Sequence, residues 1–480
     1  MVYQFGNKKR VFVDWDFIEP GYGLAWGGDR PASWEMPYGI KLAVHSPRID
    51  WEPLVKPDQP WEHDIEVHHS MFEDDGRYRL YYRIWDANPV LGEAYGGHAA
   101  SFNLAYAESE DGVNWIKPNL GTHEFNGSTN NNIIHLGKPA GSPVVFKDPS
   151  ADDNERYKLV FREKQDVFGA TSSDGLHWDV IREPIMSGYG SDTHNIVAYS
   201  EEKGKYVGYW RGRRPVDGES PQIRRTIAYA ETDDFRTWPR PKTVVGPDVH
   251  DSPDTDFYTN SYTPWPGADA HLLFPAVFER RKDLTELHMF TSRDGIAWQR
   301  ISRDPVIPKG PPGSGMEAGV YAGVGMVSIK PGEWSMPIAP QSHTHNQCQY
   351  PEGVENLPHH GFVCLATWRE DGFTSIEAES EGSFSTVPFV LKGGKLELST
   401  WSNYGGAIKV ELVEVLNERS RDYTPPVTGR SFDNCDVITG DNLHHKVTWN
   451  GESDISAWSG KLVRLRFKFL RSNLYAMQIK

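Results

Sequence analysis

The chain has 480 residues and a formal net charge of −16 at pH 7, and aromatic residues make up 12% of it, including 17 tryptophans. This length leaves room for one large domain and a small one. The negative charge argues against a nucleic acid or an anionic membrane as a partner. The three cysteines, at positions 348, 364 and 435, form no disulfide framework and lack the spacing of a metal site.

The first 60 residues contain few patterns that indicate structure or function. Residues 1–10 lack the apolar core of a signal peptide, and no stretch of the chain approaches the ~18 apolar residues of a membrane span. We therefore expect a cytoplasmic protein, or a secreted or periplasmic one whose signal has been removed. Residues 10–18 predict a strand, on which alternation would place Asp14 and Asp16 on one face.

A phrase of the form Ser-x-Asp-Gly-x-x-Trp then recurs along the chain. Complete copies lie at residues 109–115, 172–178 and 292–298; residues 232–238 carry Phe in place of Gly, and a worn copy lies at 369–375. The aspartates at positions 111, 174, 234, 294 and 371 are 63, 60, 60 and 77 residues apart. Such self-similarity indicates a repeat architecture.

Each copy of the phrase predicts a turn at the tip of a hairpin. Asp-Gly favours the turn because Gly adopts positive φ freely, and the Trp is a large apolar anchor. Strand-like segments precede each tip, so one unit reads as four antiparallel strands, the unit of a propeller blade. The sequence thus predicts an all-β, five-bladed β-propeller over residues 61–384, with residues 1–60 contributing to its closure. The blades are expected at about residues 62–119, 141–180, 192–243, 254–303 and 317–377.

The pattern changes after about residue 382. The repeated phrase ends, and strictly alternating segments follow at residues 395–400, 408–413 and 463–469. Alternation of this kind predicts sheets with one buried face. We expect a small β-sandwich over residues 385–480 that carries no chemistry.

Acidic residues open four of the five expected inner strands. Blade one begins with Asp64 or Glu66, blades three and four with Asp192 and Asp256, and blade five with Glu317. Carboxylates are costly to bury unless they are paired, so each alone would read as a turn or capping residue. Because inner strands converge on the axis of a propeller, we expect the four to line one shared funnel.

Other polar and aromatic side chains lie close to these acids in the sequence. Arginines could bind a phosphate, sulfate or uronate group of a substrate. His343-x-His345, with His194 or the pair at 359–360, could bind a metal, but strand alternation alone explains the first two; we expect neither a metal nor a cofactor. The predicted substrate-binding residues are Asp64, His68, His69, His194, Asn195, Tyr258, Asn260, Tyr321, Arg162, Arg211, His343 and His345.

The chain resembles the bacterial proteins described as glycosyl hydrolase family 32-like, which are five-bladed propellers with a C-terminal sandwich. The matching phrases lie at residues 13–18, 60–62, 104–109, 131–134, 191–195, 255–258, 433–435, 440–441 and 474–476. In the wider clan of families 32 and 43, an Asp, an Asp and a Glu from three blades act as nucleophile or base, stabiliser and acid. The resemblance implies that Asp192, Asp256 and Glu317 match this order.

The sequence also departs from that clan. The Trp-Met-Asn-Asp-Pro motif of fructosidases and a Glu-Cys acid motif are missing, and residues 147–149 (Lys-Asp-Pro) end an inner strand rather than begin it. Fructan specificity therefore does not carry over.

We expect a glycoside hydrolase that releases a terminal sugar, furanose or anionic, from an oligosaccharide or polysaccharide. Two carboxyl groups, one protonated and one ionised, are what such hydrolysis requires. Asp192 is predicted as base or nucleophile, Glu317 as general acid and Asp256 as the group that steadies positive charge, with Glu66 in reserve for a proton role. The alternatives are a non-catalytic carbohydrate-binding propeller and a glycoside phosphorylase.

Overall fold

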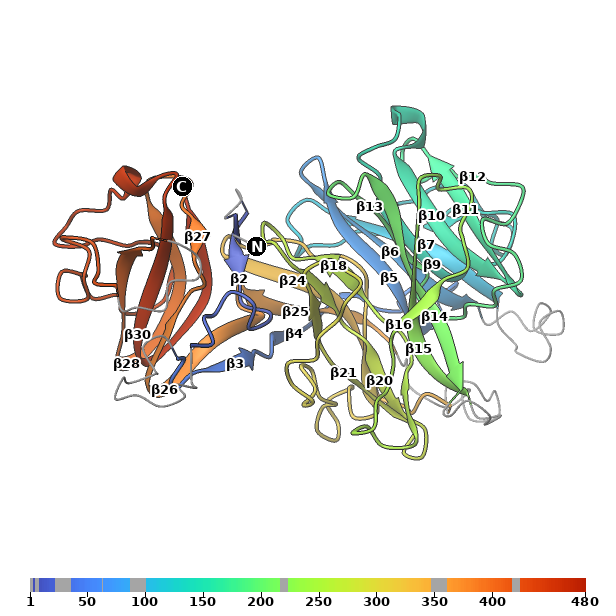
Figure 1. Cartoon of the computed structure of the whole chain (residues 1–480). Helices are drawn as coiled ribbons and strands as arrows, with labels where there is room; N and C mark the ends of the chain where they lie inside the picture. The colour runs from blue at the N-terminus through green and yellow to red at the C-terminus, as the bar shows by residue number, and fades with distance from the viewer. Residues whose placement is uncertain are drawn as a thin grey trace.

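The computed structural model describes residues 3–4, 8–21, 36–62, 64–86, 101–215, 223–346, 361–416 and 424–480. Over these ranges the chain forms β-strands and two short 3₁₀ turns, Asp153–Glu155 and Ser456–Trp458 (Figure 1). The predicted all-β fold is confirmed. No helix long and apolar enough to cross a membrane is found in the described ranges.

Three consecutive four-stranded antiparallel sheets follow the order of the predicted blades. The first contains β5 (Asp64–Asp74), β6 (Arg77–Asp86), β7 (Ser101–Ser109) and β8 (Ile133–Ile134). The second contains β9 (Gly141–Lys147), β10 (Tyr157–Glu163), β11 (Asp166–Ser172) and β12 (Asp179–Val180). The third contains β13 (Ile196–Ser200), β14 (Lys205–Pro215), β15 (Ile223–Thr232) and β16 (Lys242–Val245).

The segment expected to form the fourth blade is divided into two three-stranded sheets. One contains β17 (Thr255–Phe257), β20 (Ala276–Glu279) and β21 (Leu284–Leu287); the other contains β18 (Tyr262–Pro264), β19 (His271–Leu273) and β22 (Phe290–Ser292). The hydrogen-bond ladder between the two segments is interrupted opposite Asn260, because Pro275 has no N–H to donate. On either side of this gap the ladder continues, from Ala276 N to Thr259 O at 3.0 Å and from Ser261 N to Phe274 O at 3.1 Å. The count of five regular blades stays a prediction.

The last propeller sheet is completed by an early strand. It contains β23 (Gly319–Ala322), β24 (Glu333–Gln341), β25 (Val363–Arg369) and β4 (Arg48–Val55), with β4 antiparallel to β25. The first 60 residues therefore supply a strand to this sheet, while the domain boundaries themselves stay a prediction.

The repeated phrases form the turns that the sequence predicts. Asp174 shows the arrangement: its Oδ1 accepts the backbone N–H groups of Leu176 and His177, both at 2.8 Å. The following Gly175 has φ +81°, a left-handed conformation that glycine adopts without strain. The anchoring role of the Trp is clearest at Trp238, which is buried and packs edge-on against Trp210.

The predicted strand over residues 10–18 is wrong beyond its start. Strand β2 covers only Arg10–Val11, and the chain then bends and turns. Asp14 explains the turn, because its Oδ1 accepts the N–H of Asp16 while its Oδ2 accepts a bond from Arg293 Nε at 2.8 Å. Asp14 is buried and Asp16 is exposed, so the two do not share a face.

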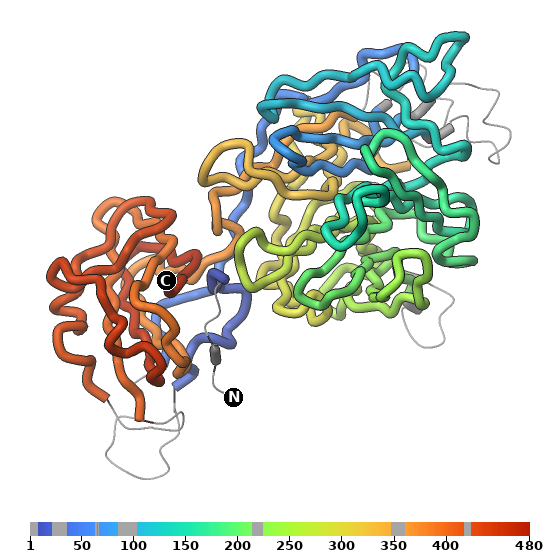
Figure 2. The backbone as a smooth tube through the Cα atoms, turned by 90° about the horizontal axis from the view of Figure 1, so that it is seen from above, coloured from blue at the N-terminus to red at the C-terminus, as the bar shows by residue number. Residues whose placement is uncertain are grey.

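The C-terminal strands form an eight-stranded sheet that also takes up strands from the N-terminal segment (Figure 1). Its members are β1 (Tyr3–Gln4), β2, β3 (Lys41–Val44), β26 (Thr374–Ser385), β27 (Phe389–Val390), β28 (Leu396–Glu414), β29 (Asn442–Lys446) and β30 (Leu462–Ile479). Phe384 and Phe467 stack in its core with ring centroids 4.8 Å apart. Figure 2 shows this C-terminal unit beside the propeller, with the N-terminal segment between them.

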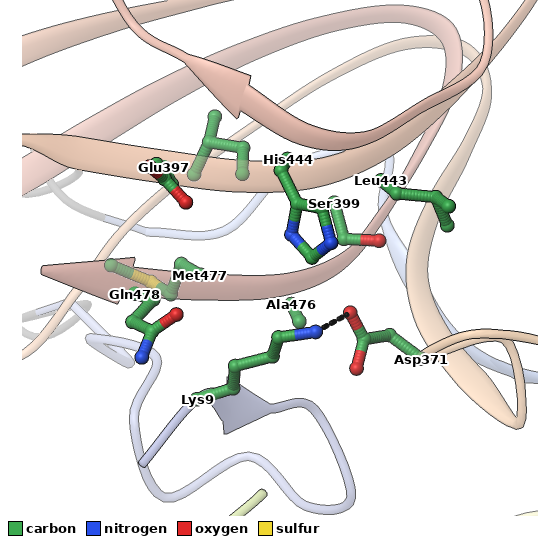
Figure 3. A pocket seen from close by; sticks show the side chains of 10 residues that line it. Lys9, Asp371, Glu397, Ser399, Leu443, His444, Ala476, Met477 and Gln478 are labelled. Carbon is green, nitrogen blue, oxygen red and sulfur yellow. Dashed lines mark hydrogen bonds and ion pairs between the residues drawn. The ribbon is translucent and has the colours of Figure 1, made fainter. Parts of the chain in front are cut away.

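Lys9 ties three parts of the chain together at that junction (Figure 3). Its ammonium pairs with Asp371 at 2.9 Å and with Glu370 at 2.5 Å, and its backbone N–H donates to Gly267 O at 3.2 Å. The cavity beside Lys9 and Asp371 is only about 10 Å³, the lower limit for a single water molecule. We therefore treat this junction as structural.

Candidate active site

The innermost strands of different sheets meet through backbone hydrogen bonds. Met71 N on β5 donates to Val324 O, and Val324 N donates to His69 O, both at 2.8 Å. Val145 N on β9 donates to the hydroxyl of Ser70 at 3.1 Å. Residues around these contacts therefore converge from several sheets, as expected of inner strands.

Asp192 lies in the short segment between Tyr189 and the start of β13. Its Oδ1 forms an ion pair with Arg211 Nη1 at 2.7 Å; the Arg211 side chain is 1% exposed and that of Asp192 is 36% exposed. Burial acts to raise the pKa of Asp192, but Arg211, with Arg162, Arg225 and Arg213, outweighs it and lowers that pKa below its usual value. Asp192 is thus an ionised carboxylate that remains accessible.

Tyr258 lies between two arginines. The guanidinium carbons of Arg211 and Arg225 are 4.5 and 4.8 Å from its ring centroid, and the ring of His345 packs edge-on at 4.4 Å. The Tyr258 carbonyl accepts bonds from Arg211 Nη2 at 2.7 Å and from Thr193 Oγ1 at 3.2 Å. We call the cluster of Asp192, His194, Arg211, Arg225, Tyr258 and His345 the Tyr258 site.

Asp256 is buried beneath this cluster, with 1% of its surface exposed. Arg225 binds it twice, through its backbone N–H at 3.0 Å and through Nη1 at 2.8 Å, and Arg280 Nε lies 3.7 Å away. These contacts fix the guanidinium of Arg225 next to Tyr258. Direct stabilisation of a sugar cation by Asp256 stays a prediction.

The histidines of the site are neutral. Burial lowers the pKa of His68 to about 3 and that of His345 to about 4, and it lowers that of His194 well below its usual value. His194 Nδ1 lies 3.1 Å from Asn260 O, and since a carbonyl only accepts, Nδ1 carries the proton. The Nε2 atom of His194, which is buried and bonds to no described residue, therefore presents a lone pair.

Asn195 is fully buried, yet neither its Oδ1 nor its Nδ2 finds a hydrogen-bond partner among the described residues. The same holds for Oδ1 of Asn260 and the hydroxyls of Thr259 and Ser261. Buried polar groups in folded proteins are nearly always bonded. These four residues therefore carry buried polar atoms that the described part of the chain leaves unsatisfied.

Glu317 lies two residues before β23 and is half-buried. Its Oε2 is buried and bonds to no residue that the structure describes. Tyr321, on the strand that Glu317 precedes, contacts the Tyr258 site through its hydroxyl, which lies 3.0 Å from His345 Nδ1.

The remaining predicted residues are placed less centrally. His68 packs edge-on against His194 with centroids 4.7 Å apart, whereas His69 is fully buried near Pro337 and Gly323. The Nδ1 atom of His343 lies 2.7 Å from the hydroxyl of the neighbouring Ser342. Asp64 and Glu66 lie in β5, but their side chains, like residues 359–360, lie outside the described part of the chain. No group of three His, Cys, Asp or Glu suited to a metal occurs among the described residues.

Sequence reasoning did not identify the partners of Asp256. Arg225 and Arg280 lie 31 residues before and 24 residues after it in the chain, and only the packing of β15, β17 and β20 brings them together. Paired arginines at positions 224–225 and 280–281 are visible in the sequence, but they do not indicate which of them turns inward.

No family model matches the chain, and no curated protein matches it. Among solved structures, one described as a glycoside hydrolase has a TM-score of 0.49 at 12% identity, covering 68% of this chain and 92% of its own. One from work on GH130 mannoside phosphorylases and glycoside hydrolases that target β-1,2 mannosidic linkages has a TM-score of 0.44 at 14% identity, covering 75% and 96%. A family 43 arabinoxylan arabinofuranohydrolase from Bacillus subtilis has a TM-score of 0.41 at 14% identity, covering 91% and 99%. The chain is similar to these structures in fold, and the resemblance to family 32 in particular stays a prediction.

Proposed function

We propose that the protein is a carbohydrate-active enzyme that hydrolyses a glycosidic bond at the Tyr258 site. The observation that carries this proposal is Asp192, an ionised and accessible carboxylate paired with Arg211, whose guanidinium also lies over the ring of Tyr258. Few precisely oriented polar groups around an aromatic surface are typical of small-molecule sites.

In the proposed reaction, Asp192 acts as base and Glu317 as acid. Asp192 takes a proton from water as the water oxygen bonds to the anomeric carbon; the glycosidic C–O bond breaks, and the leaving oxygen receives a proton from Glu317. Asp256 acts through Arg225 as a positioning residue, and Glu66 stays in reserve.

The substrate, the family and the cellular compartment are proposed from the sequence. The substrate is an oligosaccharide or polysaccharide with a terminal furanose or anionic sugar, cleaved in a five-bladed, family 32-like propeller over residues 61–384. The protein is proposed to act in the cytoplasm.

Phosphorolysis is a second candidate, favoured by the arginines around Asp192. In that reaction a phosphate oxygen bonds to the anomeric carbon as the glycosidic C–O bond breaks, and the leaving oxygen takes a proton from Glu317. Phosphate then replaces both the water and its base.

The proposal is tested by incubating the full chain with a panel of oligosaccharides, with and without inorganic phosphate. We expect new reducing sugar without phosphate. Sugar phosphate formed only in its presence would assign phosphorolysis. Binding without any product, measured by calorimetry on the same panel, would make the protein a carbohydrate-binding propeller and would contradict an enzymatic role.

A further inference from the structure

The hairpin formed by β20 and β21 lies against one side of the Tyr258 site. Phe278, on β20, packs edge-on against both Tyr258 and His345, with ring centroids 5.5 and 5.3 Å away. Arg280, the first residue after β20, places its Nε 3.7 Å from Asp256. The hairpin therefore contacts both the site and the carboxylate beneath it, although none of its residues is among those predicted from the sequence.

Asp283 ends the turn of this hairpin and binds the segment that carries His345. Its φ is +60°, a left-handed conformation that Asp, Asn and Gly adopt more readily than other residues. The carbonyl of Asp283 accepts the N–H of His345 at 3.3 Å. Its carboxylate accepts two bonds from Asn346, through Oδ2 from the backbone N–H at 2.9 Å and through Oδ1 from Nδ2 at 2.6 Å. Three hydrogen bonds therefore join the turn to two consecutive residues.

His345 extends from this segment to the centre of the site. Its ring packs edge-on against Tyr258 with centroids 4.4 Å apart, and its Nδ1 lies 3.0 Å from the hydroxyl of Tyr321. Residues 342–346 follow the end of β24 and belong to no strand, so no β-ladder fixes the position of this ring. The bonds to Asp283 take the place that ladder bonds have in a strand.

We infer that Asp283 is a positioning residue of the Tyr258 site, which holds the ring of His345 against Tyr258. The position of Tyr258 matters to the proposed reaction because the guanidinium of Arg211 lies over its ring and also pairs with Asp192. Groups that act on a substrate must be held close to one geometry, and a displacement of about 1 Å can lower the rate about 10²-fold. The inference rests on the proposed function for its effect on turnover, but not for the position of His345.

The substitution Asp283→Gly tests the inference. Glycine adopts positive φ without strain, so the change removes the carboxylate and leaves the conformation of the turn intact. Both bonds from Asn346 to the carboxylate are lost, and kcat/KM for an oligosaccharide that the wild type cleaves should fall by about 10–100-fold. Asp283→Asn tolerates the same φ and keeps one oxygen as an acceptor, so it should recover part of that loss.

The pKa of His345 separates positioning from an effect of charge. Burial lowers this pKa to about 4; the charges of Asp283 and Asp192 act to raise it, and those of Arg211 and Arg225 act to lower it further. If Asp283 acted through its charge alone, removing it would lower the pKa of His345 still more. If Asp283 holds the segment, Asp283→Gly lets water reach the ring, and the pKa should rise toward the ordinary value of about 6.5. NMR titration of the full chain with isotope-labelled histidine measures this pKa, and the His345 signal is assigned by its loss in His345→Gln.

Asp75→Gly is the matched control. Asp75 lies in the turn between β5 and β6 with φ +54°, so the change removes the same charge at the same kind of backbone position. Its side chain is 77% exposed and lies 3.6 Å from Lys147. This variant should keep the wild-type turnover and the wild-type pKa of His345.

Asn346→Ala keeps the inference testable if Asp283→Gly does not fold. Asn346 is exposed, and the change removes its side-chain bond while the charge of Asp283 stays in place. Any rise in the pKa of His345 then reports its position. We expect a smaller rise than in Asp283→Gly, and a fall of kcat/KM in the same direction.

The inference is overturned if the pKa of His345 does not rise in Asp283→Gly, or in Asn346→Ala where the first variant is unfolded. It is also overturned if Asp283→Gly lowers kcat/KM no more than Asp75→Gly does. A raised pKa with unchanged turnover would mean that Asp283 holds the segment without serving the reaction, and would contradict its role as a positioning residue. If the wild type binds glycans but cleaves none, the proposed hydrolase fails by itself, and glycan affinity replaces kcat/KM as the quantity that Asp283→Gly should lower.

Discussion

The C-terminal sandwich and the Tyr258 site both bury arginines, and they differ in what those arginines face. In the sandwich, Arg464 pairs with Glu19 at 3.1 Å and Arg466 pairs with Glu411 at 3.0 Å, so charges balance one to one. By contrast, among the residues described, Arg162 pairs with no carboxylate, and the amide of Asn195, three residues after Asp192, has no hydrogen-bond partner. The two regions therefore differ in whether their buried or half-buried arginines pair with a carboxylate among the described residues.

The largest expected effect concerns catalysis. Asp192→Asn and Glu317→Gln should each lower turnover by about 10²–10⁴-fold, the usual contribution of a general acid or base. The thermal midpoint should change little in Glu317→Gln, whereas Asp192→Asn leaves the buried Arg211 without its carboxylate and should lower the midpoint. Steady-state kinetics and thermal unfolding measure the two quantities. If both variants keep more than about a tenth of wild-type turnover, these assignments are wrong.

The opposite pattern is expected in the sandwich. Glu411→Ala leaves Arg466 buried without its carboxylate, which should lower the free energy of unfolding by about 3–5 kcal/mol. Turnover per folded molecule should stay at the wild-type level. Chemical denaturation with an activity assay checks both, and a loss of turnover in the folded fraction would contradict the separation of the two regions.

The pH dependence of kcat/KM tests the role of Arg211. Because Arg211 and the other arginines lower the pKa of Asp192, the base stays ionised below the usual pKa of an aspartate. The acid limb of kcat/KM that reports Asp192 should therefore lie at low pH in the wild type and move to higher pH in Arg211→Gln. The Asp192 carboxylate is also surrounded by other groups, namely Arg162, Arg213, Arg225 and the neutral His68. Removing Arg211 alone should therefore shift the acid limb only part of the way. An unchanged limb would mean that Asp192 is not the titrating base.

The smallest effect comes from a control on the same sandwich strand. Glu414, three residues after Glu411 on β28, pairs with Lys461 at 3.0 Å, but the two side chains are 40% and 47% exposed. Glu414→Gln should change the free energy of unfolding by at most about 1 kcal/mol, since solvent screens such pairs. A loss as large as that of Glu411→Ala would show that burial does not decide the value of these ion pairs.

The sequence predicted features that local chemistry determines. Asp-Gly turns, alternating strands and the acidic openings of inner strands are readable, and they led to Asp192, His194, Arg211 and Tyr258. The bend after Val11 was missed because it depends on Arg293, which lies far along the chain. Likewise, the burial of Asp256 against Arg225 depends on the packing of separate sheets, and no spacing within the sequence encodes that.

The pairing of β4 with β25 has a consequence for how the chain is made. Val55 and its partner Val363 are separated by roughly 300 residues, which a ribosome adds in about 15–60 s at ~5–20 residues per second. During that interval β4 has no strand to pair with, and β2 and β3 likewise wait for β30 and β26. The emerging N-terminal segment is therefore the part of the nascent protein most exposed to mispairing, and it is where a chaperone would have most to protect.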